Sequence, residues 1–171
     1  MRELILGGAR SGKSALAVRL ARSSGLAVTV VATATAGDAE MAERIARHRA
    51  ARPPAWRLVE EPIALTAALR AECAADRLVI VDCLTLWLSN LLLAEAPLES
   101  GRAGLLDALP GVPGRVLLVA NEVGLGIVPE NALARRFRDE QGALNQALAA
   151  LCDRVTLVTA GLPIVLKGPP L

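Results

Sequence analysis

The chain has 171 residues, enough for one compact domain with a buried core and few for two. Hydrophobic residues make up 53% of the chain and charged residues 21%, which excludes intrinsic disorder. The formal charge of +2 and the 2% of aromatic residues give no sign of a nucleic-acid or membrane-surface binder. We therefore predict a single domain over residues 1–171 that does not bind nucleic acid.

The cysteines and the apolar segments indicate in which cellular compartment the protein is expected. The three cysteines, Cys73, Cys83 and Cys152, have no CxxC spacing, so neither a disulfide scaffold nor a zinc knuckle is indicated. The first six residues reach glycine before a signal peptide could develop. The most apolar helical stretch, Leu84–Ala94, is too short to span a bilayer. These features predict a cytoplasmic protein without a membrane span.

Short apolar runs recur along the chain and are typical of strands covered on both faces. They are Leu4–Leu6, Ala27–Ala32, Leu78–Val81, Val116–Ala120 and Val155–Val158. Helical segments separate them, so we predict an α/β fold with a largely parallel, mixed sheet flanked by helices. Leu162–Lys167 is expected to add an antiparallel edge strand. Residues 52–54 and 109–114 are expected to be loops.

Besides the helix that carries the only histidine, three helices are predicted from the sequence. One begins near Lys13, and Leu84–Ala94 is expected to be a buried helix. A third runs from Glu130 to Leu151, with one apolar stripe expected to pack on the sheet. The stripe is formed by Leu133, Phe137, Leu144, Leu148 and Leu151.

The strongest motif is GGARSGKS, which satisfies GxxxxGK[ST] between an apolar strand and a helix. Backbone N–H groups of such a loop wrap a phosphate chain at the positive end of the helix dipole. Lys13, which we expect on an exposed loop, would neutralise phosphate oxygens, and Ser14 would bind Mg²⁺. The residues expected to contact the nucleotide are Gly7, Gly8, Ala9, Arg10, Ser11, Gly12, Lys13 and Ser14.

Asp82 ends the apolar run Leu78–Val81, as the carboxylate of a Walker B strand does. Coupled to the phosphate loop, it is the best candidate for a second Mg²⁺ ligand beside Ser14. The alternative is that Asp82 caps the following helix.

His48, the only histidine, lies on a helix predicted from Asp38, its N-cap, through Arg49. Glu40/Arg44 and Glu43/Arg47 would stabilise that helix at i, i+4. One interpretation is a solvated helix face with an exposed histidine. The other is that the arginines around His48 bind phosphate oxygens and lower the imidazole pKa, leaving a neutral nucleophile that attacks phosphorus. The arginines of this cluster are Arg44, Arg47, Arg49 and Arg52.

A further segment, NEVGLGIVP at Asn121, follows the Val116–Ala120 run. In parallel α/β sheets the carboxyl edge is where ligands bind. Asn121, Glu122 and two spaced glycines suit a loop that approaches a ligand closely, although a plain strand-to-helix turn is the alternative.

Taken in order, several motifs resemble one family. They are GGARSGKS at Gly7, ERIARHRAARP at Glu43, WRLVEEP at Trp56, VDCLTLWLSNLL at Val81, NEVGLGIVPENALARRFRD at Asn121 and GLPIVLKG near the end. Across essentially the whole chain the sequence is similar to the bifunctional adenosylcobinamide kinase/adenosylcobinamide-phosphate guanylyltransferases of cobalamin biosynthesis. The stretch from Glu95 to Gly114, a short Gly- and Pro-rich link, is where this chain departs from the resemblance.

The resemblance implies a P-loop NTPase fold of RecA-like type, often assembled as a trimer. It implies that ATP or GTP phosphorylates adenosylcobinamide, with Mg²⁺ as cofactor. It also implies that His48 takes GMP from GTP and passes it to adenosylcobinamide phosphate. The GTP contacts implied outside the loop are Thr33, Ala34, Thr35, Arg49, Ala50, Ala51, Arg52, Glu60 and Asp82.

Two other functions are compatible with the residues alone. A P-loop small-molecule kinase without nucleotidyl transfer would leave His48 idle. A nucleotide-dependent switch would need neither acceptor nor histidine, but the chain has no [NT]KxD guanine-reading motif.

Overall fold

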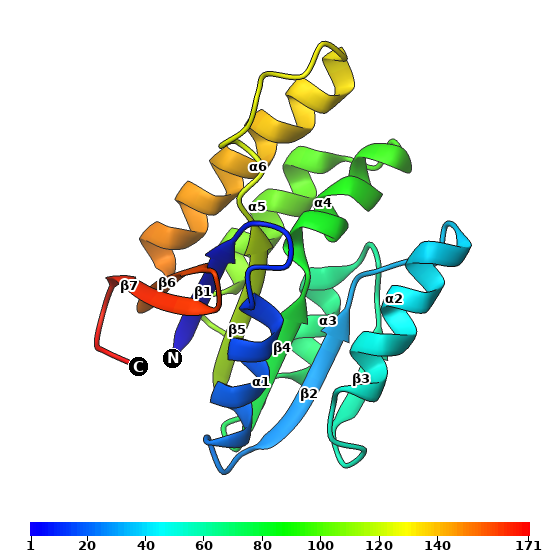
Figure 1. Cartoon of the computed structure of the whole chain (residues 1–171). Helices are drawn as coiled ribbons and strands as arrows, with labels where there is room; N and C mark the ends of the chain where they lie inside the picture. Colours follow the sequence, from blue (N-terminus) through cyan, green and yellow to red (C-terminus); the bar gives the residue numbers. More distant parts are fainter.

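The computed structural model describes all 171 residues as a seven-stranded sheet flanked by helices (Figure 1). The strands are β1 (Arg2–Gly7), β2 (Ala27–Ala32), β3 (Arg57–Glu60), β4 (Arg77–Asp82), β5 (Arg115–Asn121), β6 (Arg154–Thr159) and β7 (Leu162–Lys167). The helices are α1 (Lys13–Arg22), α2 (Ala39–Ala50), α3 (Leu65–Glu72), α4 (Leu84–Leu93), α5 (Leu98–Ala108) and α6 (Ala132–Leu151).

The strand order is β3-β2-β4-β5-β1-β6-β7. All neighbouring pairs are parallel except β6 and β7, which are antiparallel. This confirms the five predicted strands and the predicted antiparallel edge strand. The long helical crossovers agree with parallel pairing, because a tight turn cannot join parallel strands.

Alternating side chains divide the core between the two faces of the sheet. Ile5, Ile80 and Val119 belong to the smaller cluster, which packs under α1. The larger cluster fills the other face, where α3, α4, α5 and α6 pack (Figure 1). Helix α2 has no buried residue and adds nothing to either cluster. None of the helices combines the length and apolarity needed to cross a bilayer.

The sequence analysis did not predict three of the elements, which are β3, α3 and α5. Strand β3 has only four residues and is half-exposed, so it lacks the apolar run that marks the other strands. Helix α5 lies inside the stretch expected to be a Gly- and Pro-rich link. A Cβ on its Gly101 would lie 3.1 Å from Leu91 Cδ1, so this glycine lets α5 approach α4 closely.

The apolar stripe of α6 is shorter than predicted. Leu144 and Leu148 are fully buried and Phe137 packs against the core, but Leu133 and Leu151 are exposed. The first turns of α6 extend beyond the sheet, so Leu133 has nothing to pack on (Figure 1). Leu151 is the last residue of the helix, at the margin of the packed layer.

A buried ion pair links β1 to β6. Glu3 is completely buried and accepts a hydrogen bond of 2.7 Å from Arg154 Nη2. A second donor, Thr156 Oγ1, lies 3.4 Å from the other oxygen of Glu3, and Arg154 Nη1 donates to the carbonyl of Pro170. Removing one member of such a pair leaves an uncompensated charge in the core.

Arg154→Leu is therefore expected to lower the free energy of unfolding by about 3–5 kcal/mol, because the Glu3 carboxylate loses its partner. Urea unfolding measures this change. Glu43→Gln is the matched control, since the Glu43–Arg47 pair is exposed and contributes less than about 1 kcal/mol. Equal decreases in the free energy of unfolding of the two variants would show that the buried ion pair stabilises the fold no more than the exposed one.

Candidate functional site

The predicted site residues converge because parallel strands end at one edge of the sheet. Gly7 of β1 lies in register with Asn121 of β5. Ala32 of β2 lies in register with both Asp82 of β4 and Glu60 of β3. Ligands bind at this edge in open α/β sheets.

The phosphate loop follows β1 and leads into α1. A Cβ on Gly7 would clash with the carbonyl oxygen of Val158, and Gly12 has a left-handed φ of 101°, so both positions require glycine. No side chain caps the start of α1, and its first turn has no acidic residue. The hydroxyl of Ser11 is buried without a hydrogen-bond partner. A free helix N-terminus beside an unpartnered hydroxyl fits a bound phosphate.

Lys13 differs from the expectation of an exposed loop residue. It is the first residue of α1 and is only 7% exposed. Its Nζ donates a 2.7 Å hydrogen bond to the carbonyl of Gly8. Burial lowers the pKa of Lys13 from its ordinary value. The side chain folds back over the loop because the cationic head needs an acceptor once it leaves water.

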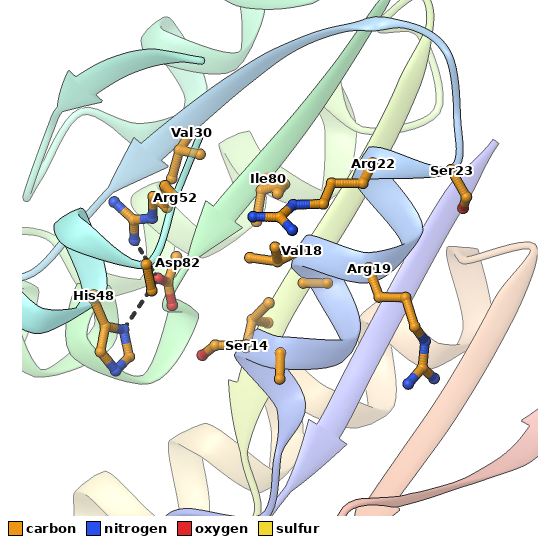
Figure 2. Close-up of a pocket in the computed structure, with 14 residues that line it drawn as sticks. Ser14, Val18, Arg19, Arg22, Ser23, Val30, His48, Arg52, Ile80 and Asp82 are labelled. Carbon is orange, nitrogen blue, oxygen red and sulfur yellow. Dashed lines mark hydrogen bonds and ion pairs between the residues drawn. The ribbon is translucent and has the colours of Figure 1, made fainter. Parts of the chain in front are cut away.

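Asp82 does not cap the helix that follows it. Cys83 occupies the N-cap position of α4, and no side chain bonds to the first turn. The Asp82 carboxylate instead accepts a 2.6 Å hydrogen bond from Arg52 Nη2, and its Oδ2 lies 3.7 Å from His48 Nδ1 (Figure 2). Burial opposes ionisation of Asp82, but the contacts with His48 and Arg52 outweigh it and hold the pKa below its usual range.

Two adjoining cavities meet at this cluster. The first, of about 440 Å³, is polar and lies between the phosphate loop and α2. The second, of about 800 Å³, is bordered by α1, the sheet and the C-terminal end of α2, with Val18, Val30 and Ile80 among its walls (Figure 2). Val119 also lines it. We call them the polar cavity and the apolar cavity. Their shared residues are Ser14, Ala15, His48, Arg52, Asp82 and Val119.

Most of the predicted site residues line one of these cavities. Those on the polar cavity are Arg10, Ser11, Gly12, Lys13, Ser14, Ala34, His48, Arg52, Glu60 and Asp82. Ala51 lines the apolar cavity. Those on neither cavity are Gly7, Gly8, Ala9, Thr33, Thr35, Arg49 and Ala50.

Thr33 has a bonding arrangement of its own at the edge of the sheet. It is completely buried, its hydroxyl donates to the carbonyl of Cys83, and the same oxygen accepts from the Cys83 N–H. These two hydrogen bonds connect the residue after β2 to the N-cap residue of α4.

Helix α2 positions His48 much as its sequence predicts. Asp38 is the N-cap, and its Oδ1 accepts a hydrogen bond from the N–H of Met41. Glu43 and Arg47 form an ion pair at 3.7 Å, but the expected Glu40–Arg44 pair is not made. Glu40 and Arg44 instead both line the polar cavity.

The walls of the apolar cavity were not recognised in the sequence. Val30 and Ile80 lie two residues before Ala32 and Asp82, so strand alternation places Ile80 on the same face of the sheet as Asp82. Arg19 and Arg22 on α1 lie at its rim. The sequence did contain a signal for Ile80, because residues two positions apart on a strand share a face and Ile80 lies two positions before Asp82.

The Asn121 segment meets the site only at its first residue. Asn121 lines the polar cavity, whereas Gly124 and Gly126 face open space. Neither glycine lines the polar or the apolar cavity. The Glu122 carboxylate is held by Asn145 of α6, which donates a 3.1 Å hydrogen bond to Oε1.

The cysteines offer no competing nucleophile. All three are free and buried. Burial raises the pKa of Cys73 to about 11 and of Cys152 to about 12, and it also raises the pKa of Cys83 beside the polar cavity. A thiol is nucleophilic as the thiolate, so all three are inert near neutral pH.

The donor set at the shared wall fits Mg²⁺ better than a transition metal. The structure has no cluster of three His, Cys, Asp or Glu residues that could bind a metal without a substrate. The Ser14 hydroxyl and Asp82 carboxylate are hard oxygen donors on the same cavities. Mg²⁺ is usually held by one or two carboxylates together with substrate phosphates.

Sequence comparisons cover the whole chain. Residues 3–166 match the family described as "CobU: Cobinamide kinase / cobinamide phosphate guanyltransferase". The bifunctional adenosylcobalamin biosynthesis protein CobP of Pseudomonas aeruginosa is 61% identical, with both chains covered completely. The bifunctional adenosylcobalamin biosynthesis protein CobU of Salmonella typhimurium is 40% identical over 96% of this chain and 98% of its own.

Solved structures share the fold at low sequence identity. One is a protein from Pyrococcus horikoshii OT3 with the project identifier PH0250. Its TM-score is 0.55 at 11% identity, over 99% of this chain and 87% of its own. An ATPase from the type III secretion system of pathogenic bacteria has a TM-score of 0.50 at 14% identity over 92% of this chain. The chain spans about half the length of that ATPase, 51%. These similarities concern the fold alone, and they confirm the predicted fold class.

Proposed function

Because the chain belongs to the cobinamide kinase/cobinamide phosphate guanyltransferase family, we propose that it carries both activities in one domain. A nucleoside triphosphate phosphorylates adenosylcobinamide, and GMP from GTP is then transferred through His48 to adenosylcobinamide phosphate. The observation that carries this proposal is the position of His48. The only histidine of the chain lies in the wall shared by the polar cavity and the apolar cavity.

In the kinase step, the phosphate loop orients the triphosphate and the acceptor hydroxyl attacks the terminal phosphorus. The bond from that phosphorus to the bridging oxygen breaks, the nucleoside diphosphate leaves with the electron pair, and the hydroxyl proton is released to solvent. The free N–H groups at the start of α1 and the ammonium of Lys13 stabilise charge on the phosphate oxygens. The Lys13 ammonium, bonded to Gly8 in the free protein, would exchange this carbonyl for a phosphate oxygen. Ser14 and Asp82 would hold Mg²⁺, which when bound neutralises part of the phosphate charge.

In the guanylyl step, the imidazole of His48 attacks the α-phosphorus of GTP and pyrophosphate leaves. No cysteine competes, because burial raises the pKa of all three thiols. The arginines beside His48 on the polar cavity, Arg44, Arg47 and Arg52, suit the charge of the phosphate chain. The apolar cavity next to His48 has room for a nucleoside at about 800 Å³.

Two further features belong to the proposal. The free, buried cysteines favour a reducing compartment, so we assign the enzyme to the cytoplasm. Exposed large apolar side chains recur from the segment after β5 into the first turn of α6, with Ile127 98% exposed, which supports assembly into a homo-oligomer. These side chains are Leu125, Ile127, Val128 and Leu133.

The proposal is tested by supplying adenosylcobinamide with ATP, GTP and Mg²⁺ and identifying the products by mass. We expect adenosylcobinamide phosphate first and the GDP derivative second. Phosphorylation without the GDP derivative would reduce the function to that of a small-molecule kinase. Nucleotide binding without either product would indicate a switch.

Asp82→Asn is expected to raise the Mg²⁺ concentration needed for half-maximal kinase activity, because an amide oxygen binds a hard dication more weakly than a carboxylate does. Initial rates of phosphorylation across a Mg²⁺ titration measure the effect. Asp76→Asn, an exposed position just before β4, is the control. An unchanged Mg²⁺ dependence in Asp82→Asn would exclude Asp82 as a metal ligand.

A further inference from the structure

We propose that Asp82 is a positioning residue for His48, holding the ring proton on Nδ1 so that Nε2 is the nitrogen that receives GMP. The inference rests on the proposed guanylyl transfer and deepens it. It starts from the contact between Asp82 Oδ2 and His48 Nδ1, which measures 3.7 Å. Such contacts are often long in a free enzyme and tighten when substrate binds.

The carboxylate is well suited to fix a ring that is itself loosely held. The side chain of Asp82 is 14% exposed, as is that of Arg52, which donates to it at 2.6 Å. The side chain of His48 is 41% exposed and makes no hydrogen bond through either ring nitrogen, so its polar contact is the one between Nδ1 and Asp82. The second ring nitrogen points away from Asp82 (Figure 2). The imidazole therefore faces a carboxylate oxygen, Oδ2 of Asp82, that Arg52 holds in place through its 2.6 Å hydrogen bond.

The tautomer follows from this arrangement. In a neutral imidazole one nitrogen is a donor and the other an acceptor, and the partner of one nitrogen decides which is which. A carboxylate accepts hydrogen bonds only, so the nitrogen that faces it must be the donor. The proton therefore stays on Nδ1, and the lone pair used for attack lies on Nε2.

The same contact serves through the reaction. The Nε2 lone pair forms a bond to the α-phosphorus, and the bond from that phosphorus to the bridging oxygen breaks, so the electron pair leaves with pyrophosphate. The ring then carries a positive charge, shared with Nδ1–H and opposed by the Asp82 carboxylate. When an oxygen of the acceptor phosphate attacks the same phosphorus, the P–N bond breaks and its electron pair returns to Nε2. The proton on Nδ1 does not move in either step.

The chain allows a direct test, because it has a single histidine. Protein labelled with ¹⁵N in histidine gives one imidazole, whose tautomer is read from long-range ¹H–¹⁵N NMR at alkaline pH without nucleotide or Mg²⁺. We expect the proton on Nδ1 in the native protein and a loss of that preference in Asp82→Asn. Glu43→Gln, which removes an exposed carboxylate from the helix of His48, should leave the tautomer unchanged. A native ring protonated on Nε2, or equal tautomers in native protein and Asp82→Asn, would overturn the proposal.

The site of attachment gives a second readout that needs no variant. After incubation of the labelled native protein with GTP and Mg²⁺, the phosphorus of the adduct couples to the nitrogen that bears it. We expect coupling to Nε2, the ring nitrogen that points away from Asp82 (Figure 2). Coupling to Nδ1 would overturn the role of Asp82 and leave guanylyl transfer intact. No adduct at all would instead overturn the proposed function.

Discussion

His48→Asn is expected to abolish covalent labelling of the protein by GTP that carries its label in the α-phosphate. Asparagine has an amide in place of the imidazole and cannot form a stable bond to phosphorus, and the buried thiols are protonated near neutral pH. The measurement is protein-bound label after incubation with GTP and Mg²⁺, without any corrinoid. The native adduct should be lost in acid and kept in alkali, because a phosphorus–nitrogen bond has that stability.

The kinase step is the control for this variant. Phosphoryl transfer goes directly to the substrate hydroxyl, so His48→Asn should still phosphorylate adenosylcobinamide. Label that persists in His48→Asn would show that another residue accepts GMP. A native protein that phosphorylates adenosylcobinamide but acquires no label would leave only the kinase half of the proposal.

Lys13→Ala is expected to slow phosphorylation of adenosylcobinamide by about 10²–10³, the usual effect of removing one electrostatic donor from a preorganised site. The ammonium supplies charge stabilisation at the phosphates, and no other lysine is near, since Lys167 lies at the end of β7. Initial rates under saturating nucleotide measure the loss.

Because Lys13 is buried and bonded to Gly8, its replacement also removes a contact that closes the loop. Urea unfolding of Lys13→Ala separates a folding defect from a catalytic one. Lys167→Ala is the matched control, because this lysine is exposed and bonds only to carbonyls at the end of α6. Phosphorylation by a folded Lys13→Ala at a near-native rate would contradict the role of the phosphate loop.

The predictable part of the fold rests on local patterns. Strands buried on both faces stand out as apolar runs, and GGARSGKS identifies its own context between a strand and a helix. Asp38 could be recognised as an N-cap because the capping contact spans only three residues. Thus the main strands, the loop and the helix of His48 were all within reach of the sequence.

The rest depends on contacts between residues far apart in the chain. Helix α3 begins at Leu65, and its N-cap residue, Ala64, has no side chain that caps it. Gly101 of α5 is explained only by its close approach to α4, and Gly104 by its approach to Thr66 of α3. The burial of Lys13 follows from how the loop folds back on itself. The pairing of Asp82 with Arg52 and His48 joins residues at least 30 positions apart, and no spacing rule identifies such a contact.

Because the chain has a single phosphate loop, the two reactions cannot take place on one chain at the same time. Both begin with a nucleoside triphosphate, and GxxxxGK[ST] occurs once in the chain. A triphosphate bound for phosphoryl transfer therefore blocks the triphosphate that would guanylylate His48, and each nucleotide competes with the other. One chain must alternate between its two chemistries, and the order in which it does so depends on which nucleotide and which form of the corrinoid are abundant.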